Sequence, residues 1–205
     1  MKHDSQLITL LEIKGLINTL WDRLTGPDAH TWLQAFKQFL RKENPWTDRI
    51  INLWRSVVVG GSTAERLMDE SIEKGFKLGI DAEYMTKSDQ FEGSIKPKKV
   101  DFVKKLLKEY GFTGTTFGEL LEFFRNHPLY QLCESEDVYY LRATYTDQPK
   151  DEQVRLAMET IINSDGATSI FVLDHNAEGL CIRDNSYYST DKVNLYYFWV
   201  ARIRK

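Results

Sequence analysis

The spacing of apolar residues along the chain changes near Cys133. Before this point they recur at intervals of three and four residues, which is typical of amphipathic helices. After it they alternate with polar residues or form short runs between turns, which is typical of β-strands. The sequence therefore predicts an α+β fold, in which an N-terminal helical half is followed by a C-terminal antiparallel β-meander of about five strands.

The first half carries several helix signals. Ser62 and Glu65, and again Thr116 and Glu119, have the spacing of a capping box, and Asp28 is a candidate N-cap. The apolar segment 50–59 fits neither pattern and its type is left open, whereas the polar stretch 87–96 is predicted to be a loop or linker. The predicted helices cover residues 6–24, 28–44, 63–77, 97–110 and 116–126.

The second half has the pattern of strands with one wetter face. Because no helical segment separates these strands, an antiparallel arrangement is expected. The chain is thus divided into a helical region, residues 1–130, and an antiparallel β region, residues 131–205, and the pattern leaves open whether the two share one core. The predicted strands cover residues 139–145, 154–160, 170–173, 180–183 and 195–204, with a hairpin turn at Asp165-Gly166.

Composition narrows the function classes. The 205 residues are 42% hydrophobic, which is enough for a packed core, and the formal net charge is -3. A chain of this charge has no overall positive field, so binding to a polyanion would need a local basic patch. The sequence shows neither a signal peptide nor a membrane span, and with two cysteines a cytoplasmic location with reduced thiols is expected.

One local basic patch exists. The predicted helix pair at 97–126 resembles a helix-turn-helix, and the lysines around its first helix could neutralise phosphates. The N-terminal end of the second helix, which enters the major groove in that motif, carries Glu119 and Glu122 instead. Nucleic-acid binding is therefore an alternative function and not the leading one. Its candidate residues are Lys96, Lys98, Lys99, Lys104 and Lys105.

Histidine and cysteine recur with the same spacing at two places. His127 lies six residues before Cys133, and His175 lies six residues before Cys181. These residue types ligate zinc, and they also form nucleophilic dyads. The short spacings that give metal motifs their specificity are missing, so buried cysteines and exposed histidines are favoured. A metal-dependent or Cys/His hydrolase is the less favoured alternative, and no metal or cofactor is predicted.

The second half is rich in aromatic residues. Tyr197 and Trp199 are assigned to the sheet core, whereas Tyr187 and Tyr188 lie in a polar segment and are candidates for contact with a partner protein. Since the chain supplies a good core and no convincing catalytic set, the leading hypothesis is a non-enzymatic interaction or regulatory protein. The sequence assigns neither a ligand nor an oligomeric state.

Several strings resemble a family of uncharacterised small bacterial proteins that is typical of candidate-phylum genomes. The resemblance rests on residues 32–46 (WLQAFKQFLRKENPW), on residues 141–149 (LRATYTDQP), on the Asp165-Gly166 turn and on the closing RIRK at 202–205. The family has no assigned activity, so the resemblance implies no catalytic residues. It implies a bacterial cytoplasmic protein that is inherited as one unit.

Overall fold

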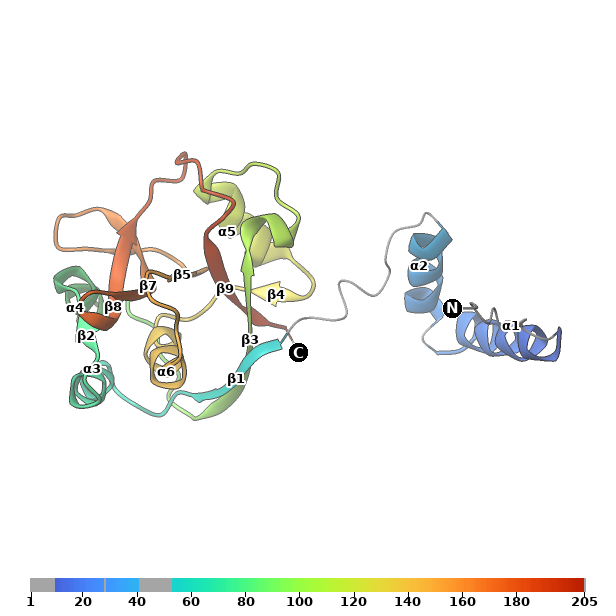
Figure 1. Ribbon diagram of the computed structural model, residues 1–205, viewed down its shortest axis with the longest axis horizontal. Coiled ribbons are helices and arrows are strands. Elements are labelled where there is room, and N and C mark those ends of the chain that lie inside the picture. Colours follow the sequence, from blue (N-terminus) through green and yellow to red (C-terminus); the bar gives the residue numbers. More distant parts are fainter. Residues whose placement is uncertain (1–9, 28, 41–52, 205) are drawn as a thin grey trace, which may run out of the picture. The chain divides into compact units, whose positions relative to one another are not determined.

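The computed structural model describes residues 10–27, 29–40 and 53–204. The chain forms two compact units, Met1–Ile51 and Asn52–Lys205, and each is described by itself (Figure 1). No helix among the described residues is long and apolar enough to cross a membrane.

The first unit contains two helices, α1 (Leu10–Thr25) and α2 (Ala29–Leu40), as the apolar spacing predicted. The backbone N–H of Ala29 donates to the carbonyl of Gly26 at 3.0 Å, and this turn joins them. The guanidinium of Arg23 lies 5.5 Å from the ring centroid of Trp32, which links the two helices. The candidate N-cap Asp28 and the predicted helical residues 6–9 and 41–44 lie outside the described residues.

The second unit is built around a mixed nine-stranded sheet. Its main path runs β1-β3-β9-β5-β7-β8-β2, while β4 pairs with β9 and β6 pairs with β7. Most neighbours are antiparallel, but β5 runs parallel to β9 and β2 runs parallel to β8. The strands are β1 (Leu53–Val59), β2 (Lys77–Leu78), β3 (Lys98–Leu106), β4 (Tyr130–Gln131), β5 (Gln153–Leu156), β6 (Ile161–Ile162), β7 (Thr168–Asn176), β8 (Gly179–Ser186) and β9 (Phe198–Ile203).

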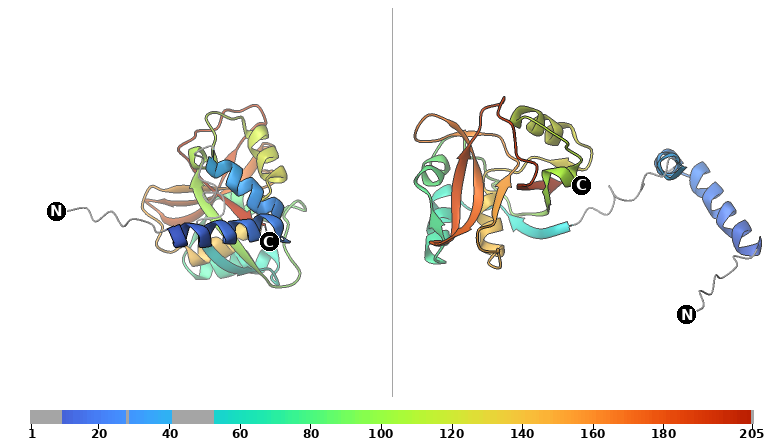
Figure 2. Two further views of the ribbon diagram at one scale, coloured as in Figure 1. Left: turned by 90° about the vertical axis from the view of Figure 1, so that its right-hand side faces the viewer. Right: turned by 45° about the horizontal axis from the view of Figure 1, so that its top comes forward.

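Helices cover both faces of this sheet (Figures 1 and 2). On one face the ring of Tyr139 in α6 packs edge-on against Phe171 of β7, at 6.5 Å between centroids. On the other face Phe117 of α5 lies 6.3 Å from Trp199 of β9. The helices of this unit are α3 (Ala64–Glu73), α4 (Ile80–Thr86), α5 (Phe117–Asn126) and α6 (Asp137–Thr144), with a short 3₁₀ helix, η1, at Leu107–Tyr110.

The predicted fold class is wrong. The sheet takes strands from both sides of Cys133 and is mixed, so the helical half and the five-stranded antiparallel meander do not exist as such. The parallel pairs were missed because the strands that form them lie far apart in the sequence. Local patterns of apolar residues carry no information about such pairing.

Two elements have the opposite type from the one predicted. Residues 98–106, predicted as helix, form strand β3, so the predicted helix pair at 97–126 is not formed. Residues 139–145, predicted as a strand, fall mainly in helix α6. The helices predicted at 63–77 and 116–126 are confirmed as α3 and α5, and the Thr116 and Glu119 capping box is present. The untyped segment 50–59 contains β1.

Candidate functional site

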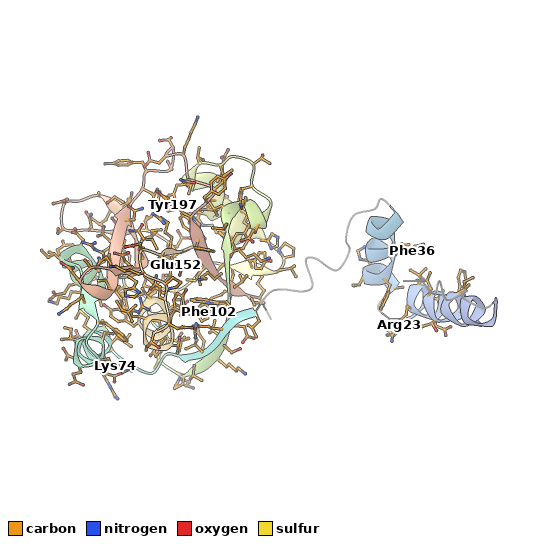
Figure 3. All side chains as sticks on the ribbon, viewed as in Figure 1. Arg23, Phe36, Lys74, Phe102, Glu152 and Tyr197 are labelled. Carbon is orange, nitrogen blue, oxygen red and sulfur yellow. The ribbon has the colours of Figure 1, made fainter. Side chains whose placement is uncertain are left out.

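A pocket lies where the parallel strands β5 and β9 begin. Because the two strands run in the same direction, their first residues, Gln153 and Phe198, lie at the same edge of the sheet. The segments that lead into them form an open pocket of about 380 Å³. We call it the tyrosine pocket. It is lined by Lys150, Asp151, Glu152, Gln153, Tyr196, Tyr197 and Phe198, of which Glu152 and Tyr197 are labelled in Figure 3.

The loop before β5 is held in a left-handed turn. Asp151 has a φ of 66°, which among non-glycine residues Asp and Asn tolerate best. Its backbone N–H donates to the carbonyl of His175 at 2.6 Å, and the N–H of His175 donates to the carbonyl of Glu152 at 3.3 Å. These two bonds fix the loop against β7, so the side chains of the loop keep their places at the pocket.

Glu152 joins the pocket to a polar cluster on the α6 face of the sheet. The Lys104 ammonium donates to both oxygens of Glu152 at 3.1 Å and to the hydroxyl of Tyr145 at 2.7 Å. The Tyr145 hydroxyl in turn donates to Oε1 of Glu152 at 2.5 Å. Burial and the bond to Glu152 raise the pKa of Tyr145 well above its ordinary value. This tyrosine therefore stays protonated and acts as a hydrogen-bond donor.

Aromatic rings close the cluster around the lysine. The Lys104 ammonium lies 4.7 Å from the centroids of Tyr145 and Phe198 and 5.4 Å from that of Trp54. Each ring face attracts the cation, and Glu152 balances its charge. The cluster is thus charge-balanced and filled by the protein's own groups. It positions the Glu152 side of the pocket and offers no free nucleophile.

Arg155 of β5 lies on the opposite face of the sheet. Its guanidinium packs on the ring of Tyr197, at 3.5 Å from Cζ to the centroid. Its Nε donates to the hydroxyl of Tyr187 at 3.0 Å, and its Nη2 donates to Oε1 of Gln153 at 3.2 Å. The residue is only 4% exposed. Two lining residues of the tyrosine pocket, Gln153 and Tyr197, are therefore held by one buried arginine.

The tyrosines at the rim remain open to solvent. Tyr196 is 69% exposed and Tyr197 is 38% exposed. The ammonium of Lys108 lies 4.6 Å from the Tyr196 centroid, so this ring too has a cation beside it. The assignment of Tyr197 to the core is wrong, because it precedes β9 and stands at the pocket. Trp199, by contrast, is fully buried as predicted.

The two candidate partner-binding tyrosines have different environments. Tyr187 is buried and stacks on Phe117 at 4.7 Å between centroids, whereas Tyr188 is 65% exposed. Both line a second pocket, of about 560 Å³, between α5 and the sheet. Tyr187 is therefore buried although its sequence neighbours are polar, and its predicted exposure is wrong. Its hydroxyl reaches Arg155, which connects the second pocket to the tyrosine pocket.

The candidate phosphate-binding lysines do not share one helix face. Lys98 and Lys99 begin β3, and Lys104 and Lys105 lie near its end. The Lys98 ammonium pairs with Glu134 at 2.7 Å, and that of Lys105 donates to the hydroxyl of Tyr130 at 3.2 Å. Lys104 pairs with Glu152, so the ammonium groups of Lys98, Lys104 and Lys105 are all engaged within the unit. Lys96 and Lys99 are exposed.

The histidines and cysteines lie on different segments: His127 follows α5, Cys133 follows β4, His175 is in β7 and Cys181 is in β8. Cys133 and Cys181 are free and buried, and burial raises the pKa of both thiols. His127 stacks on Tyr130 at 4.6 Å between ring centroids. Nδ1 of His175 lies 2.6 Å from the carbonyl oxygen of Gln148. Among the residues that the structure describes, no three His, Cys, Asp or Glu side chains come together as metal ligands.

Sequence reasoning missed most of the tyrosine pocket. The loop 150–153 is a short polar run after Pro149, and Arg155 was read as one of the polar residues on the wetter face of a strand. One signal was available: Tyr196, Tyr197, Phe198 and Trp199 are four consecutive aromatic residues, and because side chains alternate along a strand, these rings cannot all lie on one face.

No family model matches this chain, and neither a curated protein nor a solved structure matches it. The resemblance to small bacterial proteins therefore stays a prediction, and the function is argued from the pocket itself.

Proposed function

We propose that this chain is a non-enzymatic interaction or regulatory protein that binds a partner protein at the tyrosine pocket. The observation that carries the proposal is the pair Tyr196 and Tyr197, which stand 69% and 38% exposed at the rim of an open pocket. Tyrosine is enriched at protein interfaces because its ring supplies a large contact area for little loss of rotamer freedom.

The rings are held ready for contact. Lys108 lies beside the ring of Tyr196, and Arg155 packs on the ring of Tyr197. Residues that are ordered before binding lose less entropy when a partner arrives. Lys150 and Asp151, both exposed, add a polar rim to the aromatic centre. An aromatic centre with a polar rim is the usual composition of a protein interface.

The proposed location is the bacterial cytoplasm. Two free, buried cysteines and the resemblance to bacterial proteins support it. Nucleic-acid binding through the lysines of β3 is the competing proposal. It is disfavoured by the ion pairs and hydrogen bonds that already engage Lys98, Lys104 and Lys105.

The test is affinity capture from a native bacterial lysate, with and without nuclease, read by mass spectrometry. We expect the full chain to retain a defined protein that survives nuclease treatment and that is lost with Tyr196→Ala. The matched control is Tyr84→Ala, since Tyr84 is 51% exposed on α4, away from the pocket, and should retain the partner. Retention by Tyr196→Ala, or loss of every partner on nuclease treatment, would contradict the proposal.

A further inference from the structure

Arg155 is a buried cation without a carboxylate. It is 4% exposed, yet no carboxylate oxygen of the described residues lies within ion-pair distance of its guanidinium. The nearest strand offers Asp174, which faces Gln153 in the register between β5 and β7. Oδ2 of Asp174 accepts instead from Asn176 at 2.8 Å and lies 3.5 Å from Nη1 of Arg183. Arginine is rarely buried unless its charge is paired.

The donors of Arg155 are only partly used. A guanidinium has five N–H donors, and Arg155 donates one to the Tyr187 hydroxyl and one to the Gln153 amide oxygen. Both acceptors are neutral. Nη1 is buried and has no hydrogen-bond partner. The Nη1 and Nη2 groups together form the planar fork that binds a carboxylate through two parallel hydrogen bonds.

Gln153 lies between the tyrosine pocket and one side of this fork. Its planar amide places one oxygen 3.2 Å from Nη2, and the residue is exposed and lines the tyrosine pocket. We propose that the Gln153 amide stands in for the carboxylate of an acidic partner peptide, which enters the tyrosine pocket, displaces that amide and pairs with Nη1 and Nη2 of Arg155. This inference rests on the proposed function, because the peptide belongs to the partner protein.

The charges at the pocket fit this occupant. Lys150 adds a second positive charge, and the negative charge of Glu152 is balanced by Lys104. Asp151 is the carboxylate of the pocket that opposes an anion, and it is exposed and so screened by solvent. Tyr197 stays on the face of the guanidinium and forms one wall. A planar ligand is favoured because it replaces a planar amide.

The test uses nuclear magnetic resonance of the full chain with sodium acetate as the probe, sodium phosphate as the second anion and sodium chloride at matched ionic strength. We expect acetate, at concentrations where chloride has no effect, to shift the Nε–Hε signal of Arg155 and the side-chain amide signals of Gln153. Stronger shifts with phosphate than with acetate would overturn the carboxylate assignment. Equal shifts with all three salts would overturn the site.

Variants separate binding at Arg155 from a general charge effect. In Gln153→Ala the stand-in is gone, and acetate should bind at least about threefold more tightly. In Gln153→Glu an internal carboxylate fills the fork, and the acetate response should disappear. Arg155→Gln should lose the response at Gln153, whereas Arg183→Gln, which removes a half-exposed arginine on β8, should keep it. If Arg155→Gln fails to fold, the two Gln153 variants still test whether acetate binds at the guanidinium of Arg155.

The two proposals fail in different ways. If acetate shifts Arg155 but lysate capture yields no protein, the carboxylate site stands and the proposed partner protein is wrong. If a protein is captured through Tyr196 but acetate leaves Arg155 and Gln153 unmoved, the proposed function stands and the carboxylate site is wrong.

Discussion

Arg202 and Asp137 form a buried ion pair that ties the start of α6 to β9. Nε and Nη2 of Arg202 each donate to a carboxylate oxygen of Asp137 at 2.7 Å. Burial raises the pKa of Asp137 to about 6 in spite of this pairing. Glu134 beside it is only partly buried, and hydrogen bonds from Arg202 and Lys98 outweigh that burial and lower its pKa to about 2. The two carboxylates therefore respond to pH with opposite sign.

Glu134→Gln should lower the free energy of unfolding by about 2 kcal/mol near pH 7. A carboxylate whose folded pKa lies below its unfolded value stabilises the fold above the unfolded pKa, here above about pH 4.5, and loses that contribution as the pH falls toward 2. The difference between wild type and Glu134→Gln should therefore shrink as the pH falls, which denaturant unfolding at a series of pH values measures.

The titration of the neighbouring Asp137 must be separated from that of Glu134 in this experiment. Asp137 has a folded pKa above its unfolded value, so its contribution is present below about pH 4 and is lost as the pH rises through about 6. The charge of Glu134 helps to raise the pKa of Asp137, so the difference curve is read between about pH 2 and pH 4, where folded Asp137 is protonated in both proteins. Glu83→Gln, in an exposed pair with Lys87, should change little at any pH. A difference between wild type and Glu134→Gln that stays constant with pH would contradict the prediction.

The exposure of individual side chains at the site was predicted least well from the sequence pattern. Alternation along β5 placed Arg155 on the wetter face, yet it is 4% exposed because α5, Tyr187 and Tyr197 cover that face. Tyr187 was read as exposed because its neighbours are polar, and it is buried by stacking on Phe117. Exposure depends on what packs against a strand from elsewhere in the chain, and a local window does not contain that information.

The turn between β1 and α3 requires glycine at position 60. Gly60 has a φ of +92°, and a Cβ there would lie 2.6 Å from the carbonyl oxygen of Lys96 and 2.9 Å from Cβ of Ser94. An alanine at this position would therefore suffer both backbone strain from the positive φ and steric overlap of its Cβ. We expect Gly60→Ala to lower the free energy of unfolding by about 3 kcal/mol or more.

Gly111→Ala is the matched control for this turn. Gly111 has a similar φ of +94°, but no heavy atom lies within 4 Å of the Cβ position. Only the backbone term remains, so the loss should be about 1 kcal/mol. Urea unfolding of both variants measures the two losses. An equal loss in both would mean that the close approach of Lys96 and Ser94 relaxes without cost.

The two misassigned elements share a physical cause. In β3 the neighbours Phe102 and Val103 are both fully buried although they point to opposite faces, which breaks the alternation of a strand with one wetter face and mimics the spacing of a helix. In α6 both Tyr139 and Leu141 are buried, together with the polar Arg142, so the helix has no solvent face to mark its period. A periodic pattern identifies an element only when one of its faces is apolar and the other polar, and it fails where apolar residues are buried on both faces. The half-exposed helices α3 and α5 were predicted correctly for the same reason.

At the scale of the whole chain, sequence order did not predict neighbours in space. β9, the last strand, lies between β3 and β5 in the sheet. It pairs in parallel with β5, although the hairpin of β7 and β8 separates the two strands in the sequence. The tyrosine pocket exists only because of this parallel pair, which places Gln153 beside Phe198 at one edge. The aromatic run at 196–199 could have indicated one half of the site, but no local motif could have predicted the whole of it, since its two halves are brought together by topology.

The second unit should fold without the first. Among the side chains that the structure describes, every buried apolar one belongs to the second unit, from Val57 to Ala201. A unit with its own core folds independently. A fragment of residues 52–205 should therefore unfold cooperatively, with a thermal midpoint within about 2 °C of the main transition of the full chain, as followed by circular dichroism.

The same fragment decides what the first unit contributes. Ile17 and Trp21 of this unit are 59% and 67% exposed, and none of its described apolar side chains is buried. If the fragment instead melts more than about 5 °C below the full chain, the first unit must pack on the second and stabilise it. If the midpoints agree and the fragment still shows the acetate response of Arg155, the second unit holds the complete binding site. The first unit would then be free to serve a separate contact.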